Sequence, residues 1–194
     1  GRGEVAADRA RSRNLTLAGQ NAWWIDGDNY ALVLDGNSTA AVDIGALNTT
    51  GSEDYLVEAW FRADKTQAGV ASVLSTQKMD LRLDAKGRME IELVSAQDTT
   101  VANVTNEDLR DDQWHHVAVN VLKSTNGGGV VYLDGQQRKL IAATAMPELY
   151  GAKMMLGNHR IMDPAALGIF SNERLKGAID EVRIWKGRRT ASVI

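Results

Sequence analysis

The alternation of apolar and polar residues along this chain predicts a protein made of many short β-strands. From Tyr30 onward, runs rich in Val, Ile, Leu and aromatic residues are separated by turn signals at spacings of about 8–12 residues, the pattern of a sandwich or barrel. The runs cover residues 31–36, 39–44, 54–64, 70–76, 79–85, 88–94, 114–122, 130–135, 137–143, 153–157 and 179–185.

The clearest single unit is a hairpin over residues 79–94, with a three-residue turn in which Gly87 takes a positive φ. Apolar residues occupy one face, and the charged residues of the other face predict a solvated surface: Asp80, Arg82, Asp84, Arg88, Glu90 and Glu92. In this register Asp84 faces Arg88 and Arg82 faces Glu90. Asp80 also faces Glu92, a like-charge pair that the sequence does not explain.

Three regions depart from this strand pattern. Residues 1–22 are polar and read as a leader or linker, whose packing on the sandwich stays open, so we place the domain at 23–194. The stretch 158–176 is too long for an ordinary connection and indicates a functional loop or an excursion with a helical turn. In the last strand, the odd spacing from Ile179 to Val182 predicts a β-bulge near Asp180.

Composition narrows the possible classes. The 194 residues fit one domain, since domains commonly have about 100–200 residues. A formal net charge of −3 argues against nucleic-acid binding, and no apolar run reaches the length of a membrane span. The absence of cysteine excludes disulfide scaffolds, thiol nucleophiles and cysteine-based zinc sites. The chain opens with Gly1 and shows no signal peptide, so we expect a piece of a longer, multidomain parent protein.

Three segments in this order carry a family resemblance. The first is the run 31–36, which ends in Asp-Gly, with the strand 39–44 that follows it. The second combines the runs 56–61, 112–119 and 131–135, and the third is the run 177–185 near the end of the chain. Over residues 30–189 the chain resembles the laminin G-like, concanavalin A-like lectin/glucanase superfamily in its bacterial extracellular form. The resemblance implies an all-β fold, a two-sheet antiparallel jelly-roll sandwich. It also implies an extracellular or cell-surface location.

The sequence offers little support for catalysis. His115 and His116 are adjacent on a strand and point to opposite faces, so we assign them structural roles. Glucanases of the resembling superfamily carry three acids at near-alternating positions of one strand. Only Glu90 and Glu92 approach this pattern, and a solvated face explains them. We therefore expect no enzyme activity.

A ligand site is predicted where aromatic and polar side chains gather outside the strand motifs. Flat rings stack on sugar C–H faces, while amides and carboxylates bind hydroxyl groups. The predicted residues are Trp23, Trp24, Asp26, Asp28, Tyr30 and, in the long loop, His159. The alternative is that Trp23 or Trp24 plugs the end of the sandwich. The other tryptophans, Trp60, Trp114 and Trp185, lie in strand motifs and are assigned to packing.

A structural Ca²⁺ ion is the cofactor that the resemblance implies. Members of the resembling superfamily hold calcium either between the first and last strands or at the loop rim. The first kind would use Asp35, Gly36 and Asp180, and the second would use Asp26, Asp28 and Asp163.

Three functional hypotheses follow in order of preference. The first is a non-catalytic binding module of an exported bacterial protein, which recognises a glycan or a cell-surface protein. The second is a structural or adhesive spacer domain without a ligand of its own. The third is a glycoside hydrolase of the same fold, which would use Glu90 and Glu92.

Overall fold

The computed structural model describes residues 5–6, 15–18, 22–26, 29–44, 53–94, 99–123, 128–142, 153–159, 173–187 and 189. Strands are the regular elements of this part of the chain, and it contains no helix. No described helix is therefore long and apolar enough to cross a membrane.

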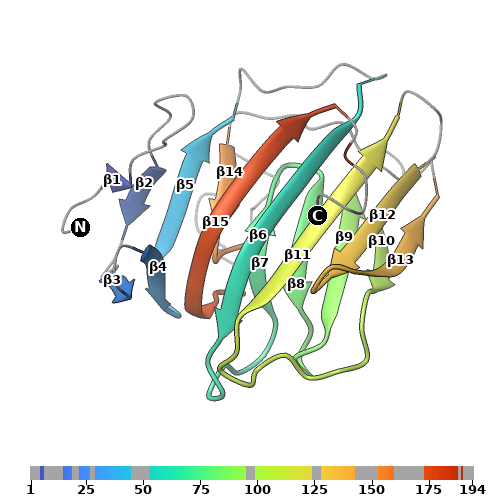
Figure 1. Ribbon diagram of the computed structural model, residues 1–194. Coiled ribbons are helices and arrows are strands. Elements are labelled where there is room, and N and C mark those ends of the chain that lie inside the picture. The colour runs from blue at the N-terminus through green and yellow to red at the C-terminus, as the bar shows by residue number, and fades with distance from the viewer. Residues whose placement is uncertain are drawn as a thin grey trace.

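The strands form two antiparallel sheets that face each other, a jelly-roll sandwich that confirms the predicted all-β fold (Figure 1). The first sheet has eight strands in the order β1-β2-β5-β14-β7-β8-β9-β10, and the second has seven in the order β13-β12-β11-β6-β15-β4-β3. Their bounds are β1 Val5–Ala6, β2 Leu15–Ala18, β3 Ala22–Asp26, β4 Asn29–Asp35, β5 Thr39–Asp43, β6 Tyr55–Ala63, β7 Ala71–Ser75, β8 Met79–Leu83, β9 Met89–Val94, β10 Thr99–Asn103, β11 His115–Leu122, β12 Gly128–Leu133, β13 Gln136–Ile141, β14 Lys153–Leu156 and β15 Lys176–Lys186.

The apolar core lies between the two sheets and follows from period-2 alternation. Residues such as Val57 and Phe61 of β6 point inward from the second sheet, and Leu81 of β8 and Ile91 of β9 point inward from the first. All four are fully buried. Burial of such apolar surface is the main favourable contribution to folding, so the inward faces hold the sheets together.

The hairpin β8–β9 has the predicted register. Arg82 lies opposite Glu90 and Asp80 lies opposite Glu92, and Gly87 in the turn has a φ of 78°. The predicted solvation of its charged face is wrong, because Asp80 is only 3% exposed and Glu90 only 9%. Side chains from elsewhere in the chain, Ser72 of β7 and His159 beyond β14, contact Asp80 on this outer face of the first sheet.

The last strand, β15, contains the predicted β-bulge. Its pairing with β6 shifts register between Asp180 and Arg183, and Glu181 takes a positive φ of 50°. The first part of β15, up to Ile179, also pairs with β4. Such a bulge re-aims the side chains that follow it.

The N-terminal strands extend both sheets. Within the range 1–22 that we predicted as a leader, β1 pairs with β2, and β2 pairs with β5 of the first sheet. Strand β3 pairs with β4 at the edge of the second sheet. The boundary at residue 22 itself stays a prediction.

The long loop predicted over 158–176 is closed at its base by backbone pairing. Asn158 and Arg174 form an antiparallel bridge, and the Leu175 N–H donates to the Gly157 carbonyl over 3.0 Å. The Ser72 N–H of β7 donates to the Glu173 carbonyl, so both ends of the loop lie against the first sheet. Residues 160–172 lie outside the described part of the chain.

Candidate functional site

A buried network of charged side chains covers the outer face of the first sheet around Arg82. The Arg82 Nε donates to Glu90 Oε1 over 2.6 Å, and its Nη1 lies 2.6 Å from Glu92 Oε2. The same Nη1 lies 4.0 Å from Asp80 Oδ2. One guanidinium therefore sits between three carboxylates, which explains how the like-charge pair Asp80 and Glu92 is tolerated.

Asp80 is the most buried acid of this network, and both of its oxygens have partners. The Ser72 hydroxyl donates to Oδ1 over 2.5 Å. His159 Nδ1 lies 2.7 Å from Oδ2. A buried carboxylate needs such partners because its desolvation is costly.

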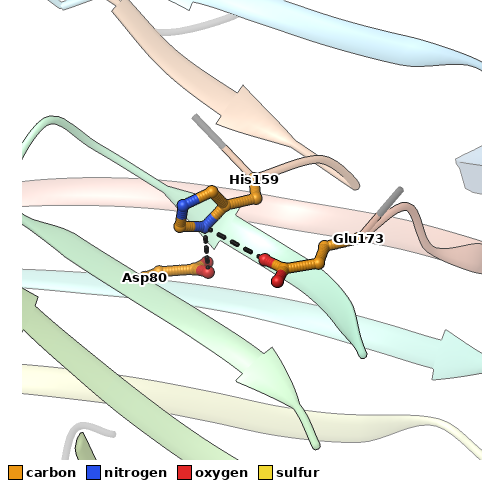
Figure 2. Close-up of side chains that lie close together, drawn as sticks. All are labelled: Asp80, His159 and Glu173. Atoms are coloured by element: carbon orange, nitrogen blue, oxygen red, sulfur yellow. Dashed lines mark hydrogen bonds and ion pairs between the residues drawn. The ribbon is translucent and has the colours of Figure 1, made fainter. Parts of the chain in front are cut away.

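Glu173 brings a second carboxylate to the same imidazole nitrogen. Its Oε2 lies 3.4 Å from His159 Nδ1, so Asp80 and Glu173 approach one atom from two sides (Figure 2). Asp80, His159 and Glu173, which we call the Asp80 cluster, place one ligand atom each within 4.8 Å of one another.

The chain positions the Asp80 cluster through the base of the long loop. Gly157 bends the backbone after β14 with a φ of 69°, and the Ser75 hydroxyl donates to the Asn158 carbonyl over 2.9 Å. These contacts position His159 against the sheet surface, and the bridge between Asn158 and Arg174 positions Glu173 beside it.

The electrostatics of the Asp80 cluster favour a cation. The hydrogen bond with Asp80 raises the pKa of His159 and outweighs the opposing effect of burial; the charges of Asp80 and Glu173 act in the same direction. A protonated His159 does not balance the charge of this region. The four carboxylates of Asp80, Glu90, Glu92 and Glu173 face two positive groups, Arg82 and His159.

A second set of polar groups lies on the outer face of the second sheet, around Glu58. Trp185 Nε1 donates to Glu58 Oε1 over 2.9 Å, and His116 Nε2 lies 3.4 Å from Oε2. Arg183 Nη1 lies 3.8 Å from Oε1. Burial raises the pKa of Glu58, but the hydrogen bonds from His116 and Trp185 and the charges of His116 and Arg183 lower it further, so the carboxylate is held ionised.

Trp60 and Trp185 expose their rings on this face. Each is 38% exposed, so the two residues that we assigned to packing do pack against neighbours but keep part of their rings at the surface. Trp60 packs on His116 with ring centroids 5.2 Å apart, and the Arg189 guanidinium lies 4.3 Å from the centre of the Trp185 ring. Trp114 is partly buried, with the guanidinium of Arg62 5.6 Å from its ring. We call Glu58, Trp60, His116, Arg183 and Trp185 the tryptophan face.

The predicted ligand residues lie in two separate places. Trp23 and Trp24 are in β3, where the register sets them opposite Leu32 and Ala31, and Asp26 ends the same strand. Tyr30 in β4 is 43% exposed, whereas Asp28 lies outside the described residues. His159 lies against β8 of the other sheet, so it does not join this group.

The residues predicted to hold calcium do not converge. Asp35 lies opposite Lys176 of β15, whereas Asp180 is four residues further along that strand, about 13 Å away at the usual rise. Asp35 Oδ1 accepts hydrogen bonds from the N–H groups of Asn37 and Ser38, a turn in which Gly36 has a φ of 84°. Of the loop acids in the alternative site, Asp28 and Asp163 lie outside the described residues.

His115 and His116 lie on opposite faces of the sheet, as their adjacent positions in one strand predict. His115 Nδ1 lies 2.9 Å from Asp134 Oδ2, and its ring packs 5.8 Å from that of Phe61 in the core. His116 belongs to the tryptophan face on the opposite side of the sheet.

Sequence comparison settles the family. Residues 35–194 match the family described as the concanavalin A-like lectin/glucanases superfamily. This chain belongs to that superfamily. The predicted resemblance is thereby confirmed. A comparison with curated proteins finds no match.

Solved structures of the same fold include the binding domain of Paraclostridial mosquitocidal protein 1. It has a TM-score of 0.75 at 11% identity, and the match covers 97% of this chain and 49% of that one. Domain 4 of AbnA, an extracellular GH43 arabinanase from Geobacillus stearothermophilus, was solved with arabinotriose. It has a TM-score of 0.67 at 20% identity, with coverage of 96% and 89%.

A third such structure is the binding domain of botulinum neurotoxin DC in complex with SialylT. It has a TM-score of 0.68 at 8% identity, with coverage of 97% of this chain and 48% of that one. The chain thus spans about half the length of these toxin binding domains. At these identities the likeness establishes the shared fold.

Proposed function

We propose that this domain is a non-catalytic binding module of an exported protein, which binds carbohydrate on the tryptophan face. One observation carries the proposal. The half-exposed indoles of Trp60 and Trp185 flank the buried, ionised carboxylate of Glu58 on a single face of the second sheet.

The arrangement suits a sugar chain better than a purely apolar partner. Trp60 lies opposite Asp180 and Trp185 lies opposite Leu56, so the two rings are offset by four residues, about 13 Å along the strands. Arg183 lies opposite Glu58 between them and is 45% exposed. Rings that stack on C–H faces, with charged groups between them for hydroxyls, are what carbohydrate recognition requires.

The contacts of the tryptophan face favour a preformed surface. Trp185 is fixed by its hydrogen bond to Glu58 and by Arg189, and Trp60 is fixed by His116. Side chains held in place before binding lose little conformational entropy when a ligand arrives, which supports affinity. Two structures of this fold support the same proposal: domain 4 of the arabinanase was solved in complex with arabinotriose, and the binding domain of botulinum neurotoxin DC was solved in complex with SialylT.

The non-catalytic part of the proposal is supported by the contacts of Glu90 and Glu92. Both carboxylates are ion-paired with the same Arg82 at 2.6 Å, and their side chains are only 12% and 15% exposed. A glycoside hydrolase needs one acid that protonates the leaving group and one that attacks or activates water. Two carboxylates tied to one guanidinium are poorly placed for either role.

Glycan-array binding and calorimetry with arabinotriose, on the protein and on variants, test this function. Trp60→Ala and Trp185→Ala should each weaken binding by about fivefold or more, taking as a guide the roughly 1–3 kcal/mol that an aromatic side chain contributes when a nucleic-acid base stacks on it. Leu140→Ala is the matched control, because Leu140 is 65% exposed on β13 of the same sheet. Circular dichroism verifies that each variant folds.

The same panel separates the alternatives. Binding that is lost in Trp23→Ala and Trp24→Ala, but kept in Trp60→Ala, would move the site to the β3–β4 hairpin predicted from the sequence. A folded protein that binds no glycan in the array would contradict the proposal and favour the spacer domain. Hydrolysis of an array glycan that is lost in Glu90→Gln would instead identify an enzyme.

A further inference from the structure

The Asp80 cluster contains a hydrogen-bonding mismatch. An imidazole Nδ1 carries at most one hydrogen, yet two carboxylate oxygens approach the Nδ1 of His159, at 2.7 Å from Asp80 and 3.4 Å from Glu173 (Figure 2). The single hydrogen satisfies Asp80. Glu173 Oε2 is buried and, among the described residues, accepts no hydrogen bond.

The acids around the Asp80 cluster also lack enough positive charge. Asp80 is 3% exposed and Glu92 opposite it has a side chain that is 15% exposed, so two acids on directly paired positions are both largely removed from water. Arg82 divides its contacts among three of the acids, and it reaches Asp80 only at 4.0 Å. Buried negative charge without a full counter-charge is costly.

We propose that Asp80, His159 and Glu173 form a binding site for a divalent transition-metal ion of the Zn²⁺ class. An ion placed between the three ligand atoms would coordinate the Glu173 oxygen, which accepts no hydrogen bond among the described residues, and would add positive charge where acids predominate. Ligand atoms bound tetrahedrally to one metal at about 2.0–2.2 Å lie roughly 3.3–3.6 Å from each other. The 3.4 Å between Nδ1 and Glu173 Oε2 already has this length, and the 2.7 Å hydrogen bond to Asp80 would lengthen when the proton between the two atoms is replaced by the ion. His159 would bind through Nδ1 after loss of its proton.

The ligand atoms select the class of metal. Ca²⁺ and Mg²⁺ prefer sites made entirely of oxygen, whereas one imidazole nitrogen with two carboxylates suits Zn²⁺ and its neighbours in the first transition row. The side chains of His159 and Glu173 are partly exposed, at 22% and 29%, whereas the Glu173 Oε2 atom itself is buried. Asp80 supplies the buried anchor, held by the Ser72 hydroxyl.

Calorimetric titration of Zn²⁺ into the full chain, freed of chelated metal and of any histidine tag, tests the proposal. We expect one saturable Zn²⁺ per chain, and a higher melting temperature in its presence, because a ligand that binds only the folded state stabilises it. Co²⁺ should give an absorption spectrum of inner-sphere coordination, which loosely held surface ions do not produce.

Matched variants identify the site. Glu173→Gln and His159→Gln should each weaken Zn²⁺ binding by about tenfold or more and remove the Co²⁺ spectrum. Glu107→Gln carries the same charge change on a side chain that is 65% exposed, so it should bind Zn²⁺ as the parent does. Melting curves without metal show whether each variant folds, and Glu173→Gln, at a partly exposed position, is the one that best tolerates substitution.

Three results would overturn the proposal. The first is that the unsubstituted chain shows no saturable Zn²⁺ binding. The second is that Glu173→Gln and Glu107→Gln bind Zn²⁺ with equal affinity. The third is that an equal concentration of Ca²⁺ displaces Zn²⁺. Because the Asp80 cluster and the tryptophan face lie on different sheets, either proposal can fail without the other.

Discussion

Trp185 donates its indole N–H to the carboxylate of Glu58 across neighbouring strands, at 2.9 Å. The ring is 38% exposed, whereas Glu58 is 7% exposed. The bond therefore joins a solvent-facing aromatic ring to a buried charge, and the stability of the surface depends on the ionisation of that charge.

Acid should weaken the fold through Glu58. The pKa of Glu58 lies below its usual value of 4.5 in the folded protein, so its contribution to stability is complete above that value and is lost as the pH falls through the lower, folded pKa. We expect Glu58→Gln to destabilise the protein by about 1–3 kcal/mol at pH 7. Urea unfolding from pH 7 to pH 3 should show the difference shrinking below about pH 4.5. A difference that stays constant across this range would contradict the role of ionisation.

Removal of Arg82 should be severe. Arg82→Met would leave the buried carboxylates of Glu90 and Glu92 without their counter-charge, and loss of one partner from a buried pair costs about 3–5 kcal/mol. Urea unfolding at neutral pH measures the loss. Arg138→Met is the control, because Arg138 lies 4.0 Å from an exposed Glu107, and it should stay within about 0.5 kcal/mol of the parent. Equal losses in both variants would show that Arg82 acts as an ordinary surface residue.

A side chain at position 157 should destabilise the fold. A Cβ there would lie 2.0 Å from Leu34 Cδ1, whereas at Gly69, which has the same φ of 69°, a Cβ would meet nothing within 4 Å. Both alanine variants carry the same backbone strain, so their difference isolates the steric clash. We expect Gly157→Ala to be less stable than Gly69→Ala by about 1–3 kcal/mol in thermal or urea unfolding. Similar stabilities would mean that Leu34 moves aside without cost.

Asp35 should act through its turn rather than through calcium. Asp35→Ala removes the acceptor of the Asn37 and Ser38 N–H groups, which should cost about 0.5–1.5 kcal/mol. Melting temperatures of the parent and the variant, measured with Ca²⁺ and with EDTA, check this. A rise with Ca²⁺ in the parent that Asp35→Ala abolishes would instead support the calcium site that the sequence suggested.

Local pattern predicted the fold and the hairpin register because both depend on residues close in sequence. The alternation over 79–94 sets Arg82 opposite Glu90 whatever the rest of the chain does, and the odd spacing after Ile179 requires the bulge that β15 contains. The same reasoning treated the charged face of the hairpin as solvated, because burial depends on segments distant in sequence.

The Asp80 cluster shows that limit directly. His159 and Glu173 are 79 and 93 positions from Asp80, and no local period relates them. One signal was present in the sequence: the like-charge pair of Asp80 and Glu92 had no local explanation, and such a pair needs a partner from elsewhere. The exposure of Trp60 could not be predicted either, since alternation separates the two faces of a strand without showing which face stays uncovered.

The bridge between Asn158 and Arg174 closes the base of the long loop against the first sheet. Since each doubling of loop length costs only about 0.6 kcal/mol in closure entropy, chain of other lengths can be exchanged above the bridge while its base stays paired. The position is therefore a natural grafting point. A peptide inserted there would be displayed from the rigid sandwich beside the Asp80 cluster, on the side of the molecule opposite the tryptophan face.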